Sequence, residues 1–203
     1  GKILCVGGNR VDIQGEPVKS VEIFDPETEQ WTVLAEMTIP RWYHSVVLLL
    51  PDGRVLVAGA EPDSQGQVNT QNYQIFTPPN LNGFEEERPV ITWAPNQIQC
   101  GTGFFVHVND KTNIEKVCLI RLGSMTHSFD MGQHYVPLTF LTNMNNNILS
   151  VTAPQNQNYA PPGTYMLFVL KRVVQGNEVH FVPSIARYVK VLPIPNQVPP
   201  EGW

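Results

Sequence analysis

The sequence contains an internal repeat, which appears when the chain is compared with itself at a shift of 52 positions. Residues 1–8, GKILCVGG, then align with residues 53–60, GRVLVAGA. At the same shift, residues 21–26, VEIFDP, align with residues 73–78, YQIFTP. Two separate matches at one shift indicate a repeated structural unit. Each copy reads as an apolar strand ending in small residues, a polar loop, and a second short strand ending in an aromatic residue and a proline.

A repeat of this kind predicts blades of a kelch β-propeller. A period near 50 residues, a double glycine (Gly7-Gly8) and a spaced aromatic pair (Phe24 and Trp31) are typical of that blade. We expect the glycines to let strands approach near the propeller axis and the aromatic pair to pack between adjacent blades. The alternative for Gly7-Gly8 is an ordinary hairpin turn.

We expect residues 1–83 to form two four-stranded antiparallel blade units. The first unit includes the strand Ser45–Leu50 and could be incomplete. Two blades cannot close a ring, because propellers need about 4–8 blades to remove their edges. We therefore expect further blades upstream of Gly1, which carries neither an initiator Met nor a targeting pattern, and expect the chain to be part of a longer protein.

A second domain is predicted after Pro78–Gly83, where the kelch spacing ends. Short alternating stretches separated by turn-rich segments then continue to residue 192, which favours an immunoglobulin-like β-sandwich over residues 88–192 followed by a tail, 193–203. No stretch shows a sustained apolar period of 3.6 residues, so the predicted fold class is all-β. The clearest predicted strands of the sandwich are Gly103–Val108, Glu115–Arg121, Ile148–Ala153, Gly163–Lys171 and Ala186–Leu192.

Composition argues against a nucleic-acid partner and against a membrane-spanning segment. With 42% apolar residues the chain can bury a core, and a net charge of −5 without a basic run predicts no nucleic-acid partner. The longest apolar run, Val46–Leu50, is far shorter than the ~20 residues that span a bilayer.

The three cysteines form neither a disulfide framework nor a CxxC metal site. Cys100 and Cys118 flank an apparent hairpin and could pair in an oxidising compartment, which would leave Cys5 over. The sequence leaves both states of this pair open.

Two segments carry residues with metal-binding chemistry. In the first, RWYHS at residues 41–45, Tyr43 and His44 stand side by side at the start of a predicted strand. Adjacent strand residues point to opposite faces, so both could ligate one ion only if the backbone turns there, which the upstream Pro40 permits. The alternative is a purely structural role for both residues.

In the second segment, GSMTHSF at residues 123–129, His127 lies in a predicted connection between strands. Such a loop can deliver a side chain to a distant site, although a solvated loop histidine has the same sequence appearance. We expect His107, His134 and His180 to be ordinary strand or surface residues.

Taken in order, these segments resemble the radical copper oxidases, the galactose oxidase and glyoxal oxidase family. The resemblance rests on the kelch unit, RWYHS, PDGRV, PPNL, GSMTH and APPGTYML, and it corresponds to the C-terminal portion of that family. It implies a mononuclear copper with Tyr43 as axial phenol ligand and His44 and His127 as imidazole ligands. It also implies that Thr126 and Ser128 orient His127.

The resemblance further implies the reaction, which is the two-electron oxidation of a small primary alcohol or aldehyde with reduction of O2 to hydrogen peroxide. Tyr43 would take the substrate proton, and a tyrosyl radical cross-linked to a cysteine would act with copper. No residue of this chain matches that Tyr and Cys, and Cys5 is not assigned to the role, so we expect the pair upstream and expect this chain alone to be inactive. The partners so implied are the remainder of the propeller, substrate and O2, and the location is secreted, periplasmic or extracellular.

Two other classes of function stay open. The chain could belong to a non-catalytic kelch-plus-sandwich protein that binds carbohydrate or a partner, or it could be a structural subunit of an assembly. An upstream Cys and Tyr able to cross-link would favour the enzyme.

Overall fold

The computed structural model describes residues 2–10, 17–60, 71–127, 129–132, 134–143 and 146–195. It is built of strands, with one 3-10 turn, η1 (Glu85–Glu87), and no α-helix in these ranges, as the all-β prediction requires. None of the described segments forms a helix long and apolar enough to cross a membrane. The chain divides into two compact units: residues 1–50, 54–79 and 123–132 form the first, and residues 51–53, 80–122 and 133–203 form the second.

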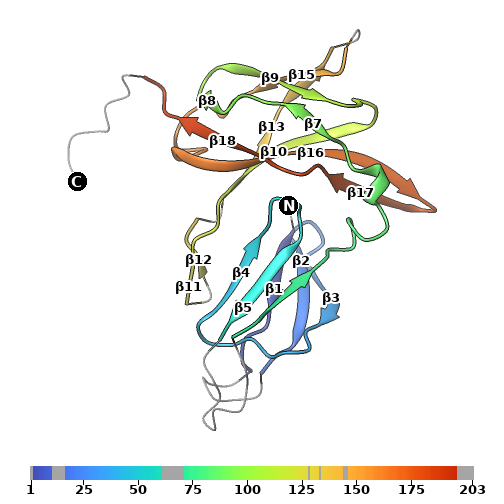
Figure 1. Cartoon of the computed structure of the whole chain (residues 1–203), viewed down its shortest axis with the longest axis vertical. Coiled ribbons are helices and arrows are strands. Elements are labelled where there is room, and N and C mark those ends of the chain that lie inside the picture. Colours follow the sequence, from blue (N-terminus) through green and yellow to red (C-terminus); the bar gives the residue numbers. More distant parts are fainter. Residues whose placement is uncertain are drawn as a thin grey trace. The chain divides into compact units, whose positions relative to one another are not determined.

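The first unit contains two antiparallel sheets whose strands reproduce the sequence repeat (Figure 1). One sheet has the order β1-β2-β3 and the other has the order β4-β5-β6. Ile3 pairs with Phe24 in the first sheet, and Val55 pairs with Phe76 in the second, so both copies share one register. The strands are β1 (Ile3–Val6), β2 (Ser20–Asp25), β3 (Gln30–Glu36), β4 (Ser45–Leu49), β5 (Val55–Gly59) and β6 (Tyr73–Phe76).

The strand Ser45–Leu49 belongs to the second sheet, not to the first unit of the repeat as expected. It pairs with β5 from Ser45↔Gly59 to Leu49↔Val55. The connection between them is short, and the Leu50 amide donates to the Arg54 carbonyl at 2.8 Å, so the two strands form a hairpin. Each sheet therefore has three strands within the described ranges instead of the expected four.

The two sheets of the first unit pack on each other through alternate residues. Val21 and Met37 of one side and Val55 and Val57 of the other form the buried core. Phe24 and Trp31 are cross-strand neighbours with ring centroids 5.1 Å apart. Trp31 is 55% exposed on the face opposite this core, so the expected packing of the aromatic pair between blades does not occur between these two sheets.

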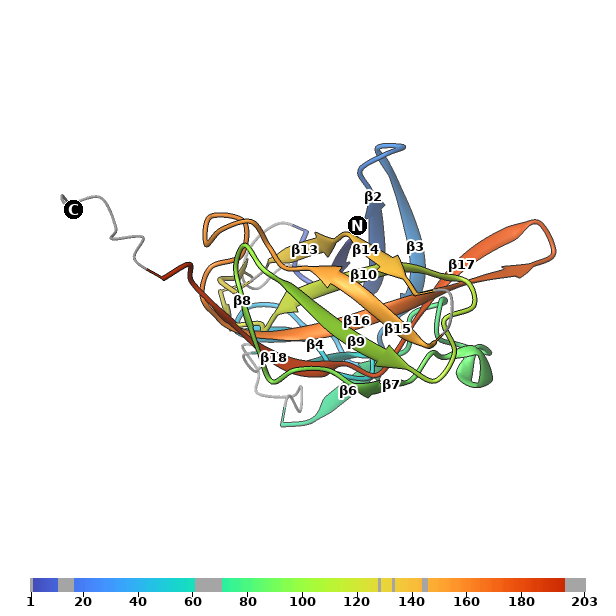
Figure 2. The same ribbon diagram turned by 90° about the horizontal axis from the view of Figure 1, so that it is seen from above.

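The second unit is a sandwich of two sheets, which Figure 1 shows as two layers. One has the order β13-β10-β16-β18-β8, with β17 paired to β16, and the other has the order β14-β15-β9-β7. Figure 2 shows the β16–β17 hairpin running beyond its neighbours. The strands are β7 (Ile91–Trp93), β8 (Gln97–Gln99), β9 (Gly103–Val108), β10 (Ile114–Arg121), β13 (Tyr135–Leu138), β14 (Phe140–Thr142), β15 (Ile148–Thr152), β16 (Gly163–Gln175), β17 (Glu178–Pro183) and β18 (Arg187–Leu192).

Period-two alternation on these strands fills the sandwich core. Val106 of β9, Leu119 of β10, Leu149 of β15 and Leu167 of β16 are all fully buried in it. The Tyr165 hydroxyl donates to the Pro161 carbonyl at 2.8 Å, four residues upstream, which resembles the tyrosine corner of immunoglobulin-like folds.

Alternation also explains why the suggested Cys100–Cys118 disulfide does not form. Both side chains are buried free thiols. Cys100 belongs to the core between the two sheets, as do Val117 and Leu119. Cys118 lies between those two residues on β10 and therefore faces the opposite side of its sheet. Burial raises the pKa of the Cys118 thiol to about 12.

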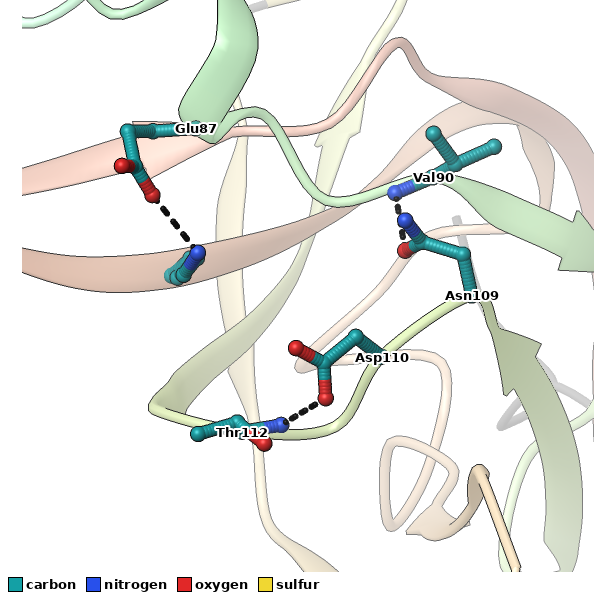
Figure 3. Close-up of polar contacts among 6 residues, drawn as sticks. Glu87, Val90, Asn109, Asp110 and Thr112 are labelled. Carbon is teal, nitrogen blue, oxygen red and sulfur yellow. Dashed lines mark hydrogen bonds and ion pairs between the residues drawn. The ribbon is translucent and has the colours of Figure 1, made fainter.

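Side-chain contacts fix the segment that leads into the sandwich (Figure 3). Lys171 Nζ lies 2.7 Å from Glu87 Oε2, and the Val90 amide donates to Asn109 Oδ1 at 2.9 Å. Asp110 Oδ1 accepts the Thr112 amide at 2.9 Å and so closes the turn between β9 and β10. The first two contacts anchor the residues that precede β7.

Candidate metal centre

Tyr43 and His44 lie in a turn immediately before β4. The Ser45 amide donates to the Trp42 carbonyl at 3.0 Å, and His44 has a φ of 63°, the positive value that the third residue of a type II turn requires. The turn removes the strand alternation that would separate the two side chains. Their rings stack with centroids 3.8 Å apart and an interplanar angle of 29°.

His127 lies at the tip of a short hairpin formed by β11 (Met125–Thr126) and β12 (Phe129–Asp130). It also has a positive φ, 50°. Although this segment falls inside the predicted range of the sandwich, residues 123–132 cluster with the first unit. Thr126 Oγ1 lies 2.7 Å from His127 Nδ1, whereas Ser128 is outside the described residues.

The structure brings the three predicted site residues together. The His127 ring centroid lies 5.1 Å from that of His44 and 5.8 Å from that of Tyr43, with interplanar angles of 80° and 65°. Both histidines are exposed, and Tyr43 is half-buried. Two imidazoles from separate segments therefore meet one phenol at a surface that solutes can reach.

Glycines at equivalent positions of the repeat hold the Tyr43 turn. A Cβ on Gly7 would lie 2.3 Å from the Arg41 carbonyl oxygen, which accepts the Gly8 amide at 2.7 Å. A Cβ on Gly59 would lie 3.0 Å from the His44 carbonyl oxygen. The repeat glycines thus permit close approach of this turn, a more specific role than the strand contact expected from sequence.

The buried Arg41 side chain connects the same turn to the second sheet. Its Nη1 donates to the Gly59 carbonyl at 2.7 Å, and its Nη2 donates to Asn72 Oδ1. Arg41 is completely inaccessible to solvent, and its burial lowers the pKa of the guanidinium. Sequence reasoning did not single out Arg41, Gly59 or Asn72. The alignment of Gly7 with Gly59 at the shift of 52 positions is the sequence signal that points to Gly59.

The remaining histidines lie elsewhere, in the sandwich unit. His107 packs beside Trp93 with ring centroids 5.1 Å apart, and His180 packs beside Phe84 at 4.6 Å. His134 Nε2 lies 3.0 Å from the Tyr159 carbonyl oxygen. Across the described ranges, no three His, Cys, Asp or Glu side chains gather as a metal-ligand set.

The chemistry of the Tyr43, His44 and His127 donors suits Cu(II), which prefers imidazole nitrogen and oxygen donors. A metal-ligating histidine usually engages its second ring nitrogen with a polar neighbour. The Thr126 contact does so at His127 Nδ1 and leaves Nε2 for a metal. The donor set therefore fits a copper ion.

Comparisons with known proteins identify the family of the chain. Residues 88–191 match the family model "Galactose oxidase-like, Early set domain", and residues 1–38 match the Kelch motif. A galactose oxidase of Gibberella zeae is 36% identical over 197 residues, which cover 94% of this chain and 28% of that protein.

An aldehyde oxidase GLOX of Vitis pseudoreticulata is 31% identical over 214 residues, covering 95% of this chain and 39% of that protein. The chain thus spans well under half the length of these relatives. A solved structure, described as a novel fungal alcohol oxidase of the AA5 family in complex with copper, has a TM-score of 0.80 and 28% identity, and the match covers 94% of this chain and 40% of that one.

Proposed function

Because the chain belongs to the galactose oxidase-like family, we propose that it forms the C-terminal part of a copper radical oxidase. The complete protein oxidises small primary alcohols or aldehydes and reduces O2 to hydrogen peroxide. The family membership confirms the predicted fold, in which kelch propeller blades precede an immunoglobulin-like sandwich. The relatives named as galactose oxidase and aldehyde oxidase support this kind of reaction.

The convergence of Tyr43, His44 and His127 is the observation that carries the proposal. The two segments are distant in sequence, yet their three rings lie within 5.8 Å of one another. His44 and His127 supply imidazole nitrogens to the metal, and Tyr43 supplies its phenol oxygen. Copper, when bound, would supply a one-electron redox centre and a Lewis acid at these residues.

Tyr43 also acts as the general base. In its phenolate form, Tyr43 Oη would accept the proton of the substrate hydroxyl and become a phenol; this proton must leave before or together with the hydrogen atom from carbon. The stacked His44 ring, 3.8 Å away, fixes the plane of the phenol.

In this proposal the second redox group, a tyrosine cross-linked to a cysteine, lies in another part of the protein. Cys5 is on a strand of the first sheet, and Cys100 and Cys118 are buried in the second unit, so these thiols are not assigned to a Tyr–Cys cross-link. We place the cross-linked pair in upstream blades. This chain by itself is then expected to be inactive.

The remainder of the propeller is the proposed macromolecular partner. Ile3, Trp31 and Val33 are 50%, 55% and 64% exposed on the face of the first sheet that points away from the core. Apolar sheet faces of this kind are covered by a neighbouring blade in a propeller. We propose a secreted location for the enzyme, as the family resemblance implies.

The test uses the full-length protein, loaded with copper and oxidised. Peroxide release is measured with a panel of small aldehydes and primary alcohols. The proposal expects turnover on at least one of them and, once the radical has been reduced by one electron, a Cu(II) electron paramagnetic resonance (EPR) spectrum with nitrogen ligands. A copper-loaded, oxidised protein that releases no peroxide on any of these substrates would instead favour a non-catalytic kelch protein that binds carbohydrate or a partner.

A further inference from the structure

The hairpin that carries His127 is closed by one carboxylate. Asp130 Oδ1 accepts the Ser124 amide at 2.8 Å and the Gly132 amide at 2.9 Å. The Met131 amide donates to the Ser124 carbonyl at 2.9 Å, next to these contacts. A single oxygen atom therefore holds both ends of the segment together.

This hairpin has little other support from its own backbone. Its ladder has only two residue pairs, Met125↔Asp130 and Thr126↔Phe129, and such short ribbons are marginal alone. His127 also holds a left-handed conformation, with a φ of 50°, which costs energy for a residue other than glycine. Closure by Asp130 opposes the tendency of the tip to relax.

The carboxylate lies where the hairpin meets β4. A Cβ on Gly123 would be 3.0 Å from Asp130 Oδ2 and 2.8 Å from Leu48 Cδ2. Both atoms thus lie on the side of Gly123 where a Cβ would stand, and one of them belongs to the strand that follows the Tyr43 turn. Asp130 fixes the base of the hairpin at a defined place beside that strand.

We propose that Asp130 is a positioning residue, whose two backbone hydrogen bonds hold His127 in place as a metal ligand. The inference rests on the proposed function, because it takes His127 to be a copper ligand. Hydrogen bonds from amides to an ionised acceptor are stronger than those between neutral groups. An asparagine retains an oxygen acceptor at this place, whereas an alanine does not.

The test compares Asp130→Ala and Asp130→Asn in the full-length, copper-loaded protein. Copper affinity is measured by chelator competition, and the ligand set is measured by nitrogen superhyperfine structure in the Cu(II) EPR spectrum. Asp130→Ala should lower copper affinity about 10–100-fold, as loss of supporting contacts does in other metal sites, and alter the spectrum. Asp130→Asn should lose clearly less than Asp130→Ala, because it keeps a neutral, weaker oxygen acceptor.

Asp110→Ala is the matched control, since Asp110 also accepts a backbone amide, that of Thr112, but lies in the sandwich unit. It should leave the spectrum and the affinity unchanged. An Asp130→Ala spectrum and affinity equal to wild type would overturn the inference. Equal damage by the Asn and Ala variants would also overturn it, because the retained acceptor would then be without effect.

Amide hydrogen exchange in the metal-free protein separates this inference from the proposed function. Ser124 and Gly132 should be protected in the wild type and in Asp130→Asn, and Asp130→Ala should lose that protection. Unprotected wild-type amides would overturn the inference even if Asp130→Ala failed to fold. A wild-type protein that shows protected amides and binds no copper would refute the proposed function while supporting closure of the hairpin by Asp130.

Discussion

Gly7 and Gly59, which the repeat places at equivalent positions, adopt the same left-handed conformation and contact the same turn. Their φ values are 69° and 71°. Gly7 lies against the Arg41 carbonyl, and Gly59 lies against the His44 carbonyl. The next pair, Gly8 and Ala60, also has positive φ values, 99° and 127°. The two equivalent glycines, Gly7 and Gly59, therefore contact the two ends of the segment that carries Tyr43 and His44.

Gly7→Ala should destabilise the first unit and weaken copper binding. The left-handed conformation costs a non-glycine residue about 1–2 kcal/mol, and the new Cβ would overlap the Arg41 carbonyl oxygen at 2.3 Å. Gly8→Ala is the matched control, because Gly8 also has a positive φ, 99°, and so carries the backbone penalty, but a Cβ there meets no atom within 4 Å. Urea unfolding and copper stoichiometry measure both effects. Equal losses in the two variants would contradict the contact-based explanation.

His127→Gly should be more stable than His127→Ala, although both lose the imidazole. Glycine adopts a φ of 50° without the penalty that alanine meets, so the expected difference is about 1 kcal/mol. Both variants should lose copper, and added imidazole should restore part of the copper binding. Thermal unfolding and copper content after dialysis provide the measurements. Wild-type copper content in either variant would remove His127 from the ligand set.

Cys100 and Cys118 should not react with iodoacetamide in the folded protein at neutral pH. Cys5 is exposed, whereas Cys100 and Cys118 are buried and their pKa values are raised by burial. Peptide mass mapping of the full-length protein should therefore find all three labelled only after unfolding. A Cys100–Cys118 disulfide found in the mapped peptides would contradict the free thiols of the structure.

The Cys118 thiol should make the folded state less stable at alkaline pH. Its pKa is about 12 in the folded chain, against an ordinary value of 9.0. At a pH between these two values, the unfolded state therefore binds fewer protons than the folded state. Stability then falls as pH rises through this window, by up to ~1.4 kcal/mol per pH unit. Cys118→Ala should show a shallower decline between pH 9 and 12 in urea unfolding. An unchanged slope would mean that this thiol does not contribute.

The sequence predicted the strands better than their partners. Periodicity located Gly103–Val108 with the bounds that β9 has. It did not show that Ser45–Leu49 pairs with β5, because alternation marks an extended segment and says nothing about which strand lies beside it. The hairpin turn at residues 50–54 decided that pairing.

At the site, the sequence supplied the donors and the structure supplied their convergence. Whether Tyr43 and His44 could face one ion depended on the backbone, and the deciding feature is the φ of 63° at His44. A histidine gives no strong signal for that conformation. Asp130 could not be recognised either, since its two amide donors come together only when the hairpin closes.

Tyr43→Phe in the full-length protein should retain copper and lose most turnover. Phenylalanine keeps the ring that stacks on His44 at 3.8 Å, so the turn and both imidazoles should stay in place. It has no oxygen to accept the substrate proton, and loss of a positioned general base typically costs ~10²–10⁴-fold in rate. Peroxide release is compared at equal copper loading, with His127→Ala as the variant that loses the metal itself. Undiminished turnover in Tyr43→Phe would assign proton removal to another group, because the missing oxygen is the one atom that distinguishes the two side chains.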